Sequence, residues 1–189
     1  MKNLESEILE VREKEQPPRT MKELENRIFQ AGEEWRTEHT ETKVNESTGD
    51  VTEKVAMPQT FTVAKILSDI VTFTFISKSN IADYSLLYIY DLDEGIYTAS
   101  NDLFNLFCKT FDVRIKPREW PQIKLMVRTL TKIKKPLESA DLVPVKNGII
   151  DLRTKELLPF SPDYVITSKI STAYHAPKRV PTDREGKTF

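Results

Sequence analysis

Apolar residues at helical spacing predict several amphipathic helices along the chain. One is expected to begin near Thr20, a favoured N-cap residue, with Glu23 completing a capping-box signature. Residues 61–72 form the expected first core helix, and Ser100 is the expected cap of a helix that ends near Phe111. The apolar positions of these three segments are Leu24, Ile28, Ala31 and Trp35; Val63, Ile66, Leu67, Ile70 and Val71; and Leu103, Phe104, Leu106, Phe107 and Phe111.

The clearest amphipathic pattern covers residues 118–135, and Pro117 and Pro121 bracket its start. At about 100° per residue its apolar positions share one face, and its basic positions fall on a separate narrow arc. The apolar face is Trp120, Ile123, Met126, Val127, Leu130 and Ile133, and the basic arc is Lys124, Arg128, Lys132 and Lys135. Trp120 is interpreted as an anchor in the core.

Two β units are expected between and after these helices. Residues 85–90 form an apolar, aromatic strand pattern, and residues 91–95 a turn before a short return strand at 96–99. In the second unit, Asn147 and Gly148 predict a turn between residues 143–145 and 149–152, because both residue types tolerate positive φ. Asp151 is expected to accept hydrogen bonds from backbone amides of the next turn, which leads into residues 156–160.

The remaining segments are polar. Residues 1–15 are compatible with a charged helix that has Leu4, Ile8 and Val11 along one face, and residues 37–55 have the composition of a flexible linker. We therefore predict an acidic helical arm and linker at 1–57, an α+β domain of β-hairpins and amphipathic helices at 58–176, and a loose basic tail at 177–189.

The charge distribution suggests a polyanionic partner. Residues 1–58 carry 9 Lys and Arg against 14 Asp and Glu, whereas residues 109–189 carry 17 against 9, so the net charge of −1 conceals a strong asymmetry. The best candidates for DNA contact are the basic arc of 118–135 and its neighbours, namely Lys116, Arg118, Lys124, Arg128, Lys132, Lys134 and Lys135. An ordinary solvated helix face explains the same pattern. A second basic group is Lys169, Lys178, Arg179, Arg184 and Lys187.

Other chemistry finds little support in the sequence. Cys108 is the only cysteine, which excludes an intrachain disulfide and a cysteine-based zinc site, and no apolar run is long enough to span a membrane. We expect a cytoplasmic protein without a cofactor or metal. Asp91 and Asp93 at a strand end fit part of a primase metal motif, but the required Ser-x-His is missing and a hairpin turn explains both residues. Gly186-Lys187-Thr188 lacks the earlier glycine of a P-loop, because that position is Pro181.

Residues 144–164 carry a family resemblance. Their pattern, Asn147-Gly148 followed by two apolar residues, Asp151-Leu152, a threonine, Pro159 and Ser161-Pro162, resembles the N-terminal-like domain of phage and plasmid primase–helicases, with a related region in poxvirus proteins. The resemblance covers roughly residues 84–176, and its upstream part has a weaker residue match.

The resemblance implies a role in DNA replication, next to a hexameric superfamily III helicase motor and often downstream of a primase domain. Residues 1–189 contain no recognisable ATPase residues of that motor. The expected function is therefore a non-catalytic adaptor or assembly module that contacts DNA, with the helicase motor, other replication proteins or further copies of itself as partners. The alternatives are a stand-alone protein-interaction module of a mobile element and a degenerate primase that uses Asp91 and Asp93.

Overall fold

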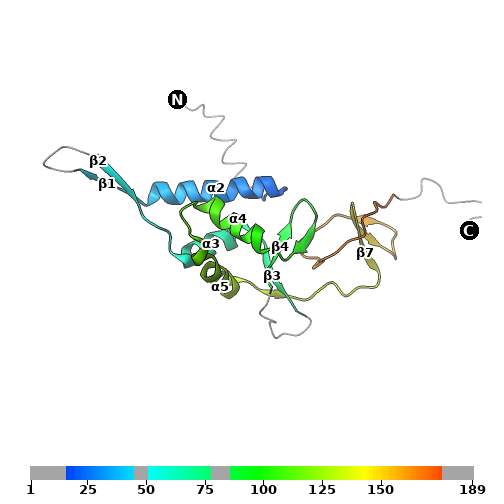
Figure 1. Cartoon of the computed structure of the whole chain (residues 1–189). Helices are drawn as coiled ribbons and strands as arrows, with labels where there is room; N and C mark the ends of the chain where they lie inside the picture. Colours follow the sequence, from blue (N-terminus) through cyan, green and yellow to red (C-terminus); the bar gives the residue numbers. More distant parts are fainter. Residues whose placement is uncertain (1–15, 45–50, 78–85, 176–189) are drawn as a thin grey trace, which may run out of the picture.

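The computed structural model describes residues 16–44, 51–77 and 86–175, and in this part the chain has the predicted α+β fold. The helical residues gather in the centre of an elongated molecule, a two-stranded hairpin extends from one end, and a small sheet lies at the other (Figure 1). The helices are α2 (Met21–Glu38), α3 (Thr60–Ile70), α4 (Asn101–Phe111) and α5 (Trp120–Leu130), with a 3-10 turn η1 (Pro117–Glu119) directly before α5.

Three small sheets accompany the helices in the described residues. The first is a hairpin of β1 (Thr40–Val44) and β2 (Val51–Val55). The second has the order β5-β4-β3-β6, from β3 (Phe73–Ile76), β4 (Tyr88–Asp91), β5 (Ile96–Thr98) and β6 (Ile133–Lys134). The third has the order β7-β8-β9, from β7 (Leu142–Val145), β8 (Gly148–Asp151) and β9 (Leu157–Leu158).

Two predicted helix starts are confirmed by their hydrogen bonds. The Thr20 hydroxyl accepts from the Glu23 amide (3.2 Å), and the Glu23 carboxylate accepts from the Arg19 amide (2.7 Å). The Ser100 hydroxyl accepts from the Leu103 amide (3.1 Å). These contacts satisfy amides that have no partner within the first turn of a helix.

One continuous core joins the four α-helices of the described residues. Leu24, Ile28 and Trp35 of α2 are buried in the same cluster as Val63 of α3 and Phe107 of α4. The core therefore begins about 35 residues before the predicted domain start at residue 58, because α2 covers α4 with its apolar face. The division of the chain into domains stays a prediction, and residues 1–15 lie outside the described residues.

Residues 40–44 and 51–55, which fall within the expected linker, form strands. The strands β1 and β2 pair in an antiparallel register that sets Thr40 opposite Val55. The β1 sequence alternates threonine and valine with charged residues, and three of the five residues of β2 are β-branched, so both sequences suit a strand. Composition alone suggested a linker because most of these side chains are polar.

The predicted helix 118–135 is shorter than expected. Helix α5 ends at Leu130, the next residue is extended, and residues 133–134 form β6, which pairs in parallel with β3. Backbone pairing supports the change, because the Lys134 carbonyl accepts from the Ser77 amide (3.1 Å). The last predicted turn is therefore replaced by an edge strand that depends on a distant partner.

Both predicted hairpins are confirmed. β4 pairs with β5 across the turn at residues 92–95, and β7 pairs with β8 across Lys146 and Asn147, one residue before the predicted Asn147-Gly148 turn. Gly148 has a φ of +153°, and a β-carbon there would lie 2.5 Å from the Leu158 carbonyl oxygen, so glycine is required at this position. No helix in the described segments is long and apolar enough to cross a membrane.

Candidate nucleic-acid interface

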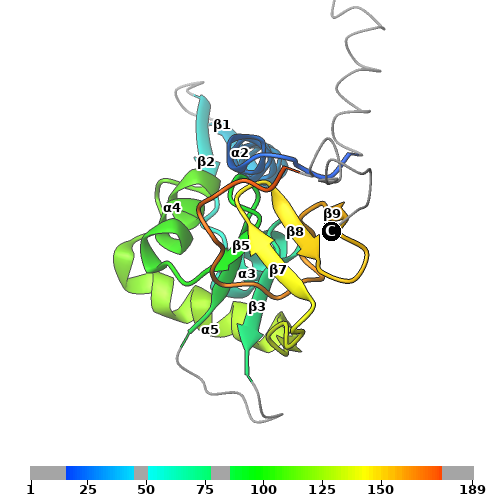
Figure 2. The same cartoon turned by 90° about the vertical axis from the view of Figure 1, so that its right-hand side faces the viewer.

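Helix α5 forms one outer edge of the helical group. Ile123 and Val127, four residues apart, are buried against the core, and Trp120 and Met126 pack beside them. This confirms the predicted anchoring role of Trp120. Both views place α5 on the side of the helical group away from α2 (Figures 1 and 2). The side of α5 opposite Ile123 therefore faces solvent.

The predicted cations fall into two groups. Lys116 and Arg118 before the helix, and Lys132 and Lys135 after it, are exposed. Lys124 and Arg128 are half-buried on the flank of the helix. The structure thus does not form the single four-residue arc that the sequence predicted, because Lys132 and Lys135 lie beyond the end of α5.

The two flanking cations contact the protein itself. The Lys124 ammonium donates to the Asn101 side-chain oxygen (2.6 Å), and the Arg128 guanidinium lies 5.4 Å from the centre of the Phe75 ring. Burial, and to a smaller degree the charge of Arg128, lower the pKa of Lys124. Asn101 carries no negative charge, so Lys124 still adds to the positive potential at α5.

The positive charge is concentrated around α5. Residues 109–135 contain nine Lys and Arg against two Asp and Glu, whereas residues 136–175 contain four against five. Most of the excess of Lys and Arg over Asp and Glu in residues 109–189 therefore belongs to α5 and the segments that flank it.

Two of the nine cations point inward. Lys134 donates to the Pro162 carbonyl (3.0 Å) and to the Tyr97 hydroxyl (3.2 Å). Burial raises the pKa of Tyr97 to about 12, and the charge of Asp163 adds to the shift. Lys134 therefore connects β6 to the segment after β9 and is not available at the surface.

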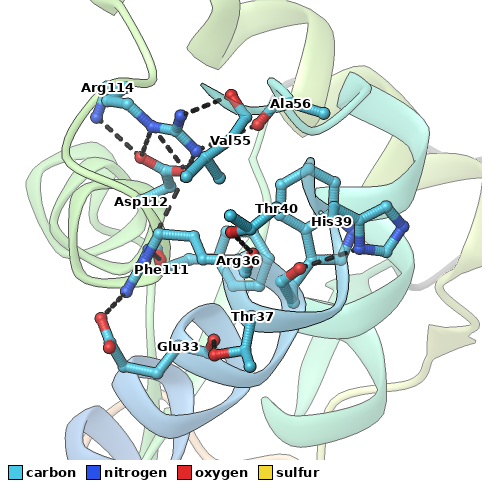
Figure 3. A network of polar contacts seen from close by, with 11 residues as sticks. Glu33, Arg36, Thr37, His39, Thr40, Val55, Ala56, Phe111, Asp112 and Arg114 are labelled. Atoms are coloured by element: carbon cyan, nitrogen blue, oxygen red, sulfur yellow. Dashed lines mark hydrogen bonds and ion pairs between the residues drawn. The ribbon is translucent and has the colours of Figure 1, made fainter. Parts of the chain in front are cut away.

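The second inward cation, Arg114, belongs to the polar network in Figure 3. Its guanidinium holds the buried Asp112 carboxylate, with a shortest distance of 2.6 Å, and also donates to the Val55 and Ala56 carbonyls (3.1 Å each). Arg36 of α2 lies 3.8 Å from the same carboxylate and donates to the Phe111 carbonyl (2.7 Å). The network fastens the ends of α2, β2 and α4 to one another.

Asp112 is ionised within this network. Burial alone would raise the pKa of its carboxyl group, but hydrogen bonds from the Arg114 side chain and amide, together with the charges of Arg114 and Arg36, outweigh burial and lower the pKa. Sequence reasoning missed this group. The local signal was the Asp112-x-Arg114 spacing, which places an aspartate after a helix and a cation two residues later.

The second predicted basic group is only partly described. Lys169 forms an ion pair with Glu94 (2.9 Å), donates to the Glu94 carbonyl (2.6 Å) and lies 5.1 Å from the centre of the Phe160 ring. Lys169 thus holds the β4–β5 turn against the segment after β9. Lys178, Arg179, Arg184 and Lys187 lie outside the described residues, as does the Gly186-Lys187-Thr188 segment.

Asp91 and Asp93 serve the turn that the sequence predicted. The Asp91 carboxylate accepts from the amides of Asp93 (3.0 Å) and Glu94 (2.9 Å), and the Asp93 carboxylate accepts from the Met21 amide (3.2 Å) at the start of α2. Within residues 16–44, 51–77 and 86–175, no group of three or more His, Cys, Asp or Glu residues could hold a metal ion.

The segment with the family-like pattern is held by side chains that the sequence singled out. Asn147 forms two hydrogen bonds with the backbone of Tyr174, one from the Tyr174 amide (2.8 Å) and one to its carbonyl (2.9 Å). The Asp151 carboxylate accepts from the Arg153 amide (2.8 Å), as predicted. The Ser161 hydroxyl accepts from the Asp163 amide (3.2 Å). These contacts explain the local fold and supply no reactive group.

Comparison with known proteins agrees with the resemblance seen in the sequence. Residues 89–187, more than half of the chain, match the family model described as D5 N terminal like. No curated protein matches the sequence. Domains of this family occur in D5-type primase–helicases of phages, plasmids and poxviruses and are generally regarded as non-catalytic. The chain belongs to the D5 N-terminal-like family.

Proposed function

We propose that this chain is a non-catalytic adaptor and assembly module of a D5-type replicative primase–helicase, and that it contacts DNA through α5 and the segments that flank it. The family places the chain in the context of replication proteins. The observation that carries the DNA contact is the concentration of nine Lys and Arg against two Asp and Glu in residues 109–135.

The geometry suits contact with a phosphate backbone. Lys116 and Arg118 lie before α5, and Lys132 and Lys135 follow it, so the exposed cations are spread over more than the length of the helix, which is about 16 Å for 11 residues. Lysine and arginine at such a surface displace the counterions of DNA, which yields affinity without sequence preference. Lys124 raises the local positive potential from the flank of the helix.

A fluorescence-anisotropy titration of the full chain with labelled single- and double-stranded DNA tests the contact. Lys132→Glu/Lys135→Glu should weaken binding at least tenfold if these side chains meet phosphates, since like charges would then face one another. The matched control is Lys22→Glu/Lys146→Glu, which changes the net charge equally at exposed positions outside residues 109–135. Equal effects of the two double variants, or no binding by the wild type, would reject the proposed contact.

The same titration distinguishes the proposed DNA contact from the alternative, a module that binds only protein. Such a module would give no salt-sensitive anisotropy change with either DNA. A replication protein that co-purifies without nucleic acid and still binds the Lys132→Glu/Lys135→Glu variant would then support the alternative.

A further inference from the structure

The solvent side of α5 carries a stripe of uncharged side chains between two cations. Gln122, Leu125 and Thr129 are exposed, and their spacing of three and four residues aligns them on one side of the helix. Arg118 precedes this stripe and Lys132 follows it, and both are exposed. The stripe therefore has the order cation, polar, apolar, polar, cation.

The stripe lies opposite the buried side of the helix. Ile123 and Val127 are 1% and 0% exposed, whereas Leu125, halfway between them in the sequence, is 52% exposed. A leucine with half its surface in water contributes less to the core than Ile123 and Val127 do. Leu125 is the central residue of the stripe.

The dimensions of α5 suit the major groove of duplex DNA. The groove is about 12 Å wide, and an α-helix with its side chains is about 10–12 Å across. The helix α5 lies along an edge of the helical group (Figure 2), and Gln122, Leu125 and Thr129 on its outer side are exposed. The positive charge of residues 109–135 matches the charge of the two backbones that border the groove.

The chemistry of the stripe matches the edges of base pairs. A glutamine side chain can pair with N6 and N7 of adenine, and an aliphatic side chain can contact the thymine methyl group. The Thr129 hydroxyl donates to the Met126 carbonyl (2.7 Å), which leaves its oxygen lone pair and its methyl group for contacts outside the helix. Cations at the two ends are placed to reach phosphates while these three residues face the bases.

We infer that α5 enters the major groove of duplex DNA, with Gln122, Leu125 and Thr129 on base edges and Arg118 and Lys132 on phosphates. The inference rests on the proposed DNA contact and adds to it the kind of nucleic acid and the residues that read it. Groove reading differs from phosphate contact alone, because uncharged side chains then distinguish one DNA sequence from another.

Duplex DNA fits this stripe better than a single strand. Binding to single strands without sequence preference uses exposed aromatic side chains on which bases stack. The stripe contains no aromatic residue, and the neighbouring Trp120 packs against the core with the Lys109 ammonium 5.3 Å from its ring centre. The stripe therefore offers hydrogen-bonding and methyl contacts rather than stacking.

The test begins with selection of a preferred duplex from a random-sequence pool by the full wild-type chain. Anisotropy then measures Kd for that duplex, for a scrambled duplex and for one strand of the selected sequence. The wild type should prefer the selected duplex over both competitors by about tenfold, and Gln122→Ala should remove this preference. Thr129→Val is the second variant and should reduce the same preference. Gln30→Ala, at an exposed glutamine of α2, is the matched control and should leave the preference unchanged.

The outcomes separate this inference from the proposed function. Equal binding to selected and scrambled duplexes, tighter binding to the single strand, or a preference that survives in both Gln122→Ala and Thr129→Val would overturn groove reading and leave the phosphate contact in place. Absence of DNA binding under all conditions would overturn both. Because Gln122 is exposed, circular dichroism should show the fold of its variant unchanged.

Discussion

Gly32 of α2 lies directly against the carbonyl group of Phe111 at the end of α4, so closely that a β-carbon on Gly32 would overlap the Phe111 oxygen. One turn later, Arg36 donates to the same oxygen (2.7 Å). The absence of a side chain on Gly32 and the hydrogen bond from Arg36 together bring the backbones of α2 and α4 into contact. This contact fixes α2 on the helical group, on the side away from α5.

The close approach predicts that Gly32→Ala destabilises the protein, which is the opposite of the usual effect of this substitution inside a helix. Gly→Ala inside a helix normally stabilises a protein by up to about 1 kcal/mol. Gly32→Ala should instead lower the free energy of unfolding by about 2 kcal/mol, because the new methyl group must push the helices apart. Urea unfolding followed by circular dichroism measures the change. Gln30→Ala, on the exposed side of α2, should leave the stability within about 0.5 kcal/mol of the wild type, and a stabilised Gly32→Ala variant would contradict the contact.

The ionised Asp112 predicts a pH-dependent stability. Asp112→Asn should lower the free energy of unfolding at pH 7 by about 2 kcal/mol, because it leaves Arg114 and Arg36 without their shared carboxylate. The pKa of Asp112 is lower in the folded chain, so its contribution is complete above the ordinary aspartate pKa of about 3.9 and is lost as the pH falls through the lowered value.

The difference between wild type and Asp112→Asn should therefore be largest at neutral pH and shrink below about pH 4. Urea titrations between pH 3 and pH 7 measure it. Asp69→Asn, at an exposed aspartate of α3, is the matched control and should show no such trend. A difference that does not change with pH would show that the Asp112 carboxylate has the same pKa in the folded and unfolded chain.

Replacing Asn147 should affect the structure around Tyr174 more than the stability of the whole protein. Asn147→Ala removes both hydrogen bonds to the Tyr174 backbone and should lower the free energy of unfolding by only about 1 kcal/mol. Amide hydrogen exchange should accelerate at Tyr174 and at Lys146, whose amide donates to the Thr172 carbonyl (3.2 Å). Asn26→Ala, on the exposed side of α2, should leave exchange at these amides unchanged, and equal protection in the two variants would remove the assigned role of Asn147.

Local sequence signals identified the elements whose stabilising contacts are close in the chain. Thr20 and Ser100 cap their helices as expected, and Gly148 occupies the positive-φ position of a hairpin. Thr20 and Ser100 bind amides three residues away, so composition and spacing suffice. The family-like segment was identified in the same way.

The errors concern contacts between distant parts of the chain. Residues 133–134 have β-branched and basic character within a helical pattern, and only the parallel pairing with β3 decides that they form a strand. The packing of α2 against α4 depends on Gly32, whose role is invisible without Phe111 beside it. Likewise, periodicity placed Lys132 and Lys135 on one arc with Lys124 and Arg128, but α5 ends at Leu130 and the following residues pair with β3.

The salt dependence of DNA binding tests the central claim, that the cations around α5 contact phosphates, most directly. The observed association constant of the wild type should fall linearly on a double-logarithmic plot against salt concentration, and Lys132→Ala and Lys135→Ala should each reduce the slope by about 0.9 for duplex DNA. Lys22→Ala, at an exposed lysine of α2, should leave the slope unchanged. Identical slopes in the wild type and all three variants, or binding that does not respond to salt, would contradict the account.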